Sequence, residues 1–179
     1  MMSPGLRKLA LTAHVTASVG WLGAVAGFLA LAISSLISQD AQTVRSDYIA
    51  MELTARFVIV PLSFASLLTG LVQSLGTKWG LFRHYWVLAK LVINVFANIV
   101  LLIYMPTLVY LGGVAAEPAL SSDDLAMLRD PSPVLHSTAA LVLLLVATVL
   151  GVYKPRGMTL YGWRKQQQSS TAFQTSGAA

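Results

Sequence analysis

Few side chains in this sequence could do chemistry, and His14 and Lys90 are the most informative of them. Each lies about five residues inside the start of a long apolar stretch. An imidazole can ligate haem iron, and a lone charge at the bilayer centre costs at least about 2.5–3.5 kcal/mol. Lys90 also has a structural explanation, because a lysine near the interface can extend its ammonium group to the headgroups.

Lys90 belongs to a polar stripe. At about 100° per residue, Lys90, Asn94 and Asn98 fall within about 80° of one another on a helix, and Trp86 and Arg83 extend the stripe toward its start. The asparagines are typical of hydrogen bonds between membrane helices. The first and third apolar stretches run in the same direction, so we expect Lys90 at the depth of His14.

The first apolar stretch has two distinct faces. His14 and Trp21 share one face, whereas Gly20, Gly23 and Gly27 lie on nearly the opposite one. Small residues allow another helix to approach closely. We therefore predict that the glycine face packs against a helix of this chain or of a partner, and that protein surrounds this stretch.

A third set of polar residues lies along the second apolar stretch. Ser63, Ser66, Gly70 and Gln73 form a stripe of small and polar side chains, and Arg56 lies near its outer end. Packing explains most of the stripe. Gln73 and Arg56 are the members to test for function, because close approach of helices does not need long polar side chains.

The two other histidines are less informative. His14 and His136 should differ in depth by about 20 Å, so they cannot flank one haem iron. His14 with His84 is conceivable if the turn before the third stretch folds inward, although His84 beside Tyr85 and Trp86 is typical of an interfacial residue. The roles of His84 and His136 stay open.

Several classes of function are excluded by what the sequence lacks. There is no cysteine, and therefore no disulfide, thiol nucleophile or covalent haem attachment. There is also no HExxH motif, no serine nucleophile motif, no glycine-rich phosphate loop and no pair of buried carboxylates, so hydrolysis has no candidate residues. The basic residues are spread between apolar stretches, which argues against a nucleic-acid partner.

The elements that position these residues follow from composition. Of 179 residues, 56% are hydrophobic and 11% charged, which indicates that the chain contacts the lipid bilayer rather than forming a soluble domain. The apolar stretches are long enough to cross as helices. We predict an all-α, integral membrane four-helix bundle with spans at about residues 9–37, 55–77, 85–112 and 133–153. The first span is too long for a signal peptide, the alternative at that position.

Charge predicts the orientation, because Lys and Arg near the spans are retained in the cytoplasm. Three basic residues, Arg45, Arg56 and Arg129, lie on one side together with all seven acids. Eight basic residues lie on the side of the termini: Arg7, Lys8, Lys78, Arg83, Lys154, Arg156, Arg164 and Lys165. Both termini should therefore be cytoplasmic.

The connections differ in character. The segment from Asp40 to Arg56 should extend the second helix outward, and residues 117–133 should be a loop with one short helical turn. Ser132 followed by Pro133 resembles a cap and first-turn pair that opens the fourth helix. Residues 154–179 begin as a basic segment and continue without apolar periodicity, which predicts a disordered cytoplasmic tail.

Short motifs resemble a known family. They are HVTASVGWLG from His14 to Gly23, Arg56, PLSFASLLTGL from Pro61 to Leu71, and WVLAKL from Trp86 to Leu91. Together they resemble an uncharacterised bacterial family of four-span integral membrane proteins. They are more distantly similar to the membrane-bound haem-containing protoporphyrinogen oxidases and the copper-resistance D-type proteins. The resemblance covers about residues 6–153 and implies the bacterial cytoplasmic (inner) membrane as the location.

This resemblance implies a haem b within the bundle, with His14 as the axial ligand to the iron and Lys90 near it, pairing with a propionate. Arg56 lies on the opposite side of the membrane and cannot belong to that cluster. Spacing places His14 and Lys90 at one level, and the haem itself rests on the resemblance.

Two functional hypotheses follow. In the first, the protein has a redox or haem-handling role: Trp21 and Trp86 wall the porphyrin, and Lys90 with Arg83 neutralises its carboxylates. In the second, it is a non-enzymatic membrane assembly component or small carrier without cofactor, in which Asn94 and Asn98 join helices. Its Gly20, Gly23 and Gly27 face would bind a membrane protein partner or a second copy in a homo-oligomer. The sequence leaves open whether the protein is an enzyme, and of what substrate.

Overall fold

The computed structural model describes residues 2–76 and 80–176, with side chains through residue 168. Within these residues all secondary-structure elements are helices, apart from one isolated β-bridge between His84 and Met158. The predicted all-α fold is confirmed. Thr77, the last residue of the predicted second span, lies outside the described residues.

The first helix, α1, spans Pro4–Ile37. Ser3 caps its start by accepting a hydrogen bond from the backbone N–H of Leu6, and a proline occupies the first turn, where a missing N–H costs nothing. Its buried residues recur every three or four positions and so form one stripe: Ala17, Trp21, Val25, Phe28, Ala32 and Ser35.

The second crossing is one continuous helical rod. It consists of α2 (Ala41–Thr54), the π-helix η1 (Ala55–Ile59) and α3 (Val60–Gly76). In the π turn the N–H of Val60 donates to the carbonyl of Ala55, five residues back. The wide turn directly precedes Pro61, whose ring has no N–H and would crowd the preceding turn of a regular helix. The prediction that the segment from Asp40 to Arg56 extends the second helix is confirmed.

Three further helices complete the bundle: α4 (Tyr85–Ala116), the short α5 (Ser122–Leu128) and α6 (Ser132–Tyr153). The start of α6 corrects one prediction, because Ser132 is not the cap but the first helical residue. Asp130 takes the capping role, since its Oδ1 accepts from the N–H of Ser132 at 2.6 Å. The hydroxyl of Ser132 instead contacts Tyr104 and His136.

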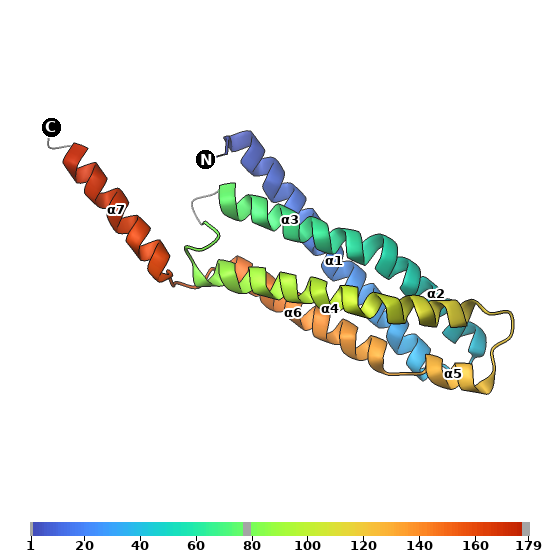
Figure 1. Ribbon diagram of the computed structural model, residues 1–179. Helices are drawn as coiled ribbons and strands as arrows, with labels where there is room; N and C mark the ends of the chain where they lie inside the picture. Colours follow the sequence, from blue (N-terminus) through green and yellow to red (C-terminus); the bar gives the residue numbers. More distant parts are fainter. Residues whose placement is uncertain (1, 77–79, 177–179) are drawn as a thin grey trace.

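The four crossings form a ring in which neighbouring helices are antiparallel. Helix α1 packs on the rod of α2, η1 and α3 and on α6, and α4 packs on the same rod and on α6 from the other side. Helices α1 and α4 are therefore diagonal partners across the bundle. In Figure 1 the α1–α3 pair and the α4–α6 pair diverge toward the end that carries both termini and converge toward α5. We call these the termini end and the α5 end.

The apolar core lies toward the α5 end, where α2 and α5 add residues to it. Tyr48, Met51, Leu108 and Leu128 are among its fully buried side chains. Within the described residues, four helical segments are long and apolar enough to cross a membrane. At most 28% of the most apolar window of any of them is buried inside the protein, so lipid must cover the remaining apolar surface. The chain is an integral membrane four-helix bundle.

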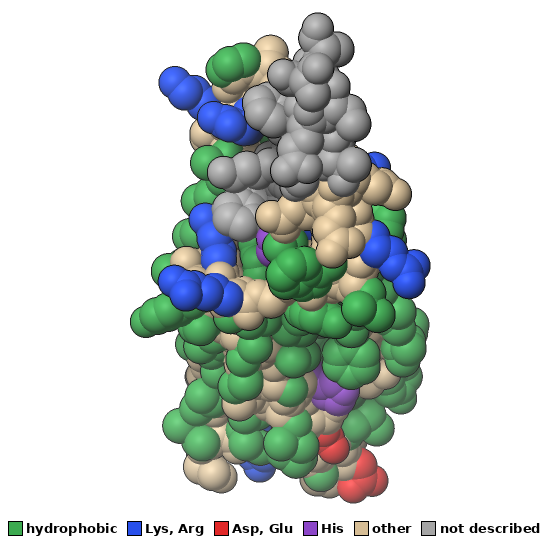
Figure 2. Space-filling model, turned by 90° about the vertical axis from the view of Figure 1, so that its left-hand side faces the viewer, with side chains coloured by type: hydrophobic (Ala, Val, Ile, Leu, Met, Phe, Trp, Pro, Cys, Tyr) green, Lys and Arg blue, Asp and Glu red, His purple; other side chains and the backbone are tan. Residues whose placement is uncertain are grey.

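The distribution of charge agrees with this arrangement. Figure 2 shows Lys and Arg mainly in the upper part of the visible face, hydrophobic side chains over its middle and lower parts, and acidic side chains near a basic one at its lower edge. Both termini lie at the same end (Figure 1). That this end faces the cytoplasm stays a prediction from the positive residues.

The tail differs from the prediction of disorder. Residues Leu160–Ser176 form a helix, α7. The connection before it is hydrogen-bonded to the turn that precedes α4. The N–H of Thr159 donates to the carbonyl of Arg83 at 3.0 Å, and the Thr159 hydroxyl accepts from the N–H of Gly162. Arginine, lysine and glutamine follow in sequence, and their high helix propensity favours a helix without an apolar stripe.

Candidate functional site

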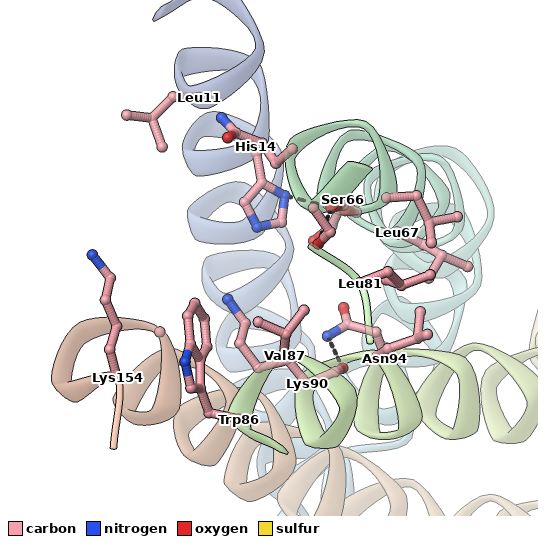
Figure 3. Close-up of a pocket in the computed structure, with 16 residues that line it drawn as sticks. Leu11, His14, Ser66, Leu67, Leu81, Trp86, Val87, Lys90, Asn94 and Lys154 are labelled. Atoms are coloured by element: carbon pink, nitrogen blue, oxygen red, sulfur yellow. Dashed lines mark hydrogen bonds between the residues drawn. The ribbon is translucent and has the colours of Figure 1, made fainter. Parts of the chain in front are cut away.

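A cavity of about 200 Å³ lies at the termini end, between α1, α3, α4 and α6. We call it the His14 pocket. Its apolar walls are largely leucine side chains, and its polar lining comes from every helix around it. That polar lining consists of His14, Ser66, Gln73, Ser74, Trp86, Lys90, Asn94 and Lys154. Figure 3 shows His14 on α1 and Lys90 on α4 reaching into this space from different sides.

The imidazole of His14 is held by α3. Its Nδ1 lies 3.2 Å from the carbonyl oxygen of Ser66 and 3.1 Å from Oγ1 of Thr69. The Thr69 hydroxyl donates its own proton to the carbonyl of Ala65 at 2.6 Å, so both neighbours of Nδ1 act as acceptors. Nδ1 must therefore carry the proton. In the neutral ring this leaves Nε2 with a free lone pair, which is the form that ligates a metal.

Gly70 provides the space for this ring. A Cβ added at Gly70 would lie 3.1 Å from Cε1 of His14, closer than ordinary contact. A second hydrogen bond, 2.8 Å long between the hydroxyls of Ser18 and Ser66, joins α1 and α3 one turn further into the bundle. Hydrogen bonds to α3 thus hold the His14 ring in place, and the lack of a side chain at Gly70 leaves the space that the ring occupies.

Lys90 enters from the diagonal helix without an anionic partner. The structure records one ion pair among its described residues, between Arg56 and Glu52 at 3.5 Å, and it lies toward the α5 end. Lys90 is half-buried, and a Cβ at Gly151 on α6 would lie 2.9 Å from its Nζ. Gly151 therefore gives the lysine its path into the pocket. A half-buried ammonium group without a carboxylate favours an anionic ligand.

The asparagines of the polar stripe have different roles. The Asn94 amide donates to the carbonyl of Lys90 at 2.8 Å, and Asn98 donates in the same way to the carbonyl of Asn94. Asn98 also accepts from the hydroxyl of Ser63 at 2.8 Å and so joins α4 to α3. The predicted hydrogen bond between helices is therefore present at Asn98, while Asn94 lines the His14 pocket.

Gln73, singled out for its long polar side chain, lines the same pocket. Its Nε2 is buried and has no hydrogen-bond partner among the described residues. A buried donor without a partner is costly, which points to a ligand or water that accepts from it. Gly70 and Gly151 were not recognised as site residues from sequence, because their role depends on which side chains lie opposite them.

Two predicted site residues do not line this pocket. Trp21, which is 2% exposed, lines a second cavity nearer the α5 end, so it does not wall a ligand held at His14. Arg83 lies in the turn before α4, where its carbonyl accepts from Thr159. Trp86 does line the pocket. Arg56 lies on the exposed side of η1, next to the core residue Ala55, and pairs with Glu52, so it is separate from the cluster around His14 as predicted.

The glycine face of α1 also differs in part from its prediction. A Cβ at Gly20 would lie 3.2 Å from the Leu62 side chain, so this glycine does allow α3 to approach. Gly23 and Gly27 are exposed, and a Cβ on either would meet nothing within 4 Å. The described residues of the other helices therefore do not cover α1 at these two positions.

The residues present allow a test of fit for haem. Among the described residues no group of three or more His, Cys, Asp or Glu could hold a bare metal ion. A haem needs only an axial ligand, and the anchored His14 with its free Nε2 has the required chemistry. The cavity of about 200 Å³ is smaller than the roughly 300–1,000 Å³ of typical ligand sites. The pocket must therefore widen to admit a porphyrin.

The fold and the pocket define a class: a four-helix integral membrane protein with a basic, half-buried pocket at the end that carries its termini. Comparisons of the chain with protein-family models, with curated proteins and with solved structures find no match. The resemblance described from the short motifs stays a prediction.

Proposed function

We propose that the protein binds haem b in the His14 pocket and has a redox or haem-handling role in the bacterial inner membrane. The observation that carries the proposal is the hydrogen bonding of His14, whose Nδ1 proton is directed to two acceptors on α3, so that the neutral ring has its free lone pair on Nε2. Hydrogen bonding of one ring nitrogen to a carbonyl is typical of histidines that ligate a metal through the other.

The roles of the surrounding residues follow from their chemistry. His14 would ligate the iron through Nε2, and Ser66 and Thr69 would fix the orientation of its ring. The ammonium group of Lys90 would pair with a propionate, and Trp86 would contact the porphyrin face. Gln73 Nε2 is available to donate to a second carboxylate oxygen. When bound, the haem supplies a redox-active iron.

The test is an absorption spectrum of the full chain, purified in detergent from cells supplied with haem. We expect a Soret band that His14→Gly abolishes and that added imidazole restores, since free imidazole can occupy the space left by the side chain. Lys90→Ala should weaken haem binding about tenfold or more, as expected for loss of a charged hydrogen bond. Lys8→Ala, which removes an exposed lysine from α1, is the matched control and should have no effect.

A protein without a Soret band, or with one that His14→Gly leaves unchanged, would rule out this function. Loss of the band without rescue by imidazole, in a variant that elutes from size exclusion like the unmodified protein, would contradict ligation by His14 in particular. These outcomes separate a missing ligand from a misfolded chain, because the rescue takes place in the same purified variant.

A second candidate function, a membrane assembly component, is favoured by the open space at Gly23 and Gly27. Exposed small residues on a membrane helix allow close approach of another helix. Gly23→Leu with Gly27→Leu should then dissociate a homo-oligomer or release a co-purifying membrane protein, measured as molar mass in detergent by light scattering. An unchanged molar mass would exclude this candidate.

A further inference from the structure

A second cavity, of about 210 Å³, lies nearer the α5 end, between α1, η1, α4 and α6. We call it the His136 pocket. It shares no lining residue with the His14 pocket, and its walls are apolar and aromatic, including Trp21, Phe28 and Phe96. No Asp, Glu, Lys or Arg lines it. Because burying an unpaired charge is costly, a ligand of this pocket must be uncharged.

One end of the His136 pocket is polar. The rings of Tyr104 and His136 stack with centroids 4.1 Å apart and planes inclined by 13°, so each holds the other in place. Nδ1 of His136 lies 2.8 Å from the carbonyl oxygen of Ser132. A carbonyl can only accept, so Nδ1 carries the proton and Nε2 of the neutral ring is an acceptor.

Tyr104 offers the complementary group. Its hydroxyl oxygen accepts from the hydroxyl of Ser132 at 3.3 Å, which leaves the phenolic proton of Tyr104 available to donate. The stacked pair therefore contributes one acceptor and one donor to the lining of the pocket. A hydroxyl group on a ligand can satisfy both, because it donates one proton and accepts another, whereas a ketone or an ether can only accept.

The position of the pocket determines how a ligand reaches it. Phe96 on α4 is 54% exposed, and Ala139 and His136 on α6 are also exposed, although all three line the cavity. The lining therefore continues onto the lipid-covered surface between these two helices. Ala55 and Ile59 of the π-helix form part of the wall, and π turns occur frequently at functional sites.

We infer that the His136 pocket binds an uncharged, lipid-soluble ring compound that carries a hydroxyl group, of the phenol or hydroquinone class. The ligand enters from the bilayer between α4 and α6. Its hydroxyl donates to Nε2 of His136 and accepts from Tyr104, while its ring and apolar chain contact the aromatic walls. This site is independent of haem binding in the His14 pocket.

The experiment compares two probes on the full chain in lipid nanodiscs. Para-heptylphenol carries the hydroxyl, and para-heptylanisole replaces its proton with a methyl group. We expect the phenol to bind about tenfold more tightly, because the anisole leaves the acceptor of His136 without a donor. His136→Phe keeps the stacked ring and should remove this preference.

Ala140→Leu provides the second variant, because Ala140 lines the cavity and a larger side chain fills it. It should abolish binding of both probes, whereas Ala30→Leu, at an exposed position of α1 outside both pockets, should not. Equal affinities for the two probes, or binding that Ala140→Leu leaves unchanged, would overturn the inference. The Soret band is measured on the same samples, so failure here is distinct from failure of the haem proposal.

Discussion

The hydrogen bond between Ser63 and Asn98 allows a quantitative prediction about the bundle. Both side chains are buried, with 0% and 4% of their surface exposed, and the Ser63 hydroxyl is 2.8 Å from Oδ1 of Asn98. Ser63→Ala would leave this oxygen without its donor. An unsatisfied buried group costs about 1–3 kcal/mol in proteins generally, but hydrogen bonds between membrane helices average about 0.6 kcal/mol and reach about 1.7.

The lower of these two ranges of free energy should apply to Ser63→Ala. The Ser63 proton is shared with the carbonyl of Val60, also at 2.8 Å, so only part of it serves Asn98. We expect Ser63→Ala to lower the free energy of unfolding by about 1 kcal/mol. The double variant with Asn98→Leu should cost less than the sum of the single changes, because it removes both partners at once.

The assay is reversible unfolding in mixed micelles with increasing dodecyl sulfate, applied to the two single variants and the double variant. Ser74→Ala is the control, since the Ser74 hydroxyl donates only within its own helix, to Gly70. It reports the change in helix propensity alone and should show no coupling to Asn98→Leu. Additive effects of Ser63→Ala and Asn98→Leu, within about 0.3 kcal/mol, would refute the proposed link between α3 and α4.

Three further predictions concern other parts of the chain. Gly151→Ala should weaken haem binding but leave unfolding nearly unchanged, because the new Cβ meets only the flexible end of Lys90; a Soret titration beside the micelle assay measures both. Leu128→Ala should lower the free energy of unfolding by about 2–5 kcal/mol, because Leu128 is 0% exposed and anchors α5 in the core. Hydrogen bonds from Thr43 to the carboxylate lower the pKa of Asp40, so this cap should stabilise the fold above the unfolded-state pKa. That stabilisation should be lost as the pH falls through the lowered pKa of Asp40 in the folded state. The free energy of unfolding measured against pH checks this, and Asp40→Asn should show no such loss.

Sequence alone predicts the crossings well because the membrane limits the choice. A stretch without charge that is long enough to span lipid has few alternatives to a helix, so the four crossings follow from hydropathy. The common depth of His14 and Lys90 followed from the helix rise and the direction of the crossings, and both residues do line one pocket. The hydrogen bond made by Asn98 was likewise expected from its place on the polar stripe.

Sequence does not determine which helices become neighbours. Trp21 shares a helical face with His14, yet at a rise of about 1.5 Å per residue it lies far enough along α1 to enter the other cavity. Gly20 meets α3 while Gly23 and Gly27 do not, because α1 has neighbours on only part of its circumference. The roles of Gly70 and Gly151 depend on side chains more than 50 residues away in sequence, which no local pattern encodes.

The π turn at Ala55–Ile59 makes the effect of a change in length depend on where in the second crossing it falls. Deleting one residue in this turn would restore a regular helical turn and leave the following residues facing as they do now, because a π turn holds one residue more than an α turn. The same deletion in α3 between Val60 and Ser66 would instead rotate Ser66 and Thr69 by about 100° about the helix axis and turn them away from His14, although no residue of the His14 pocket had been replaced. We therefore expect natural changes in length within the second crossing to be confined to the π turn, and those elsewhere in the bundle to the segment that joins α4 to α5.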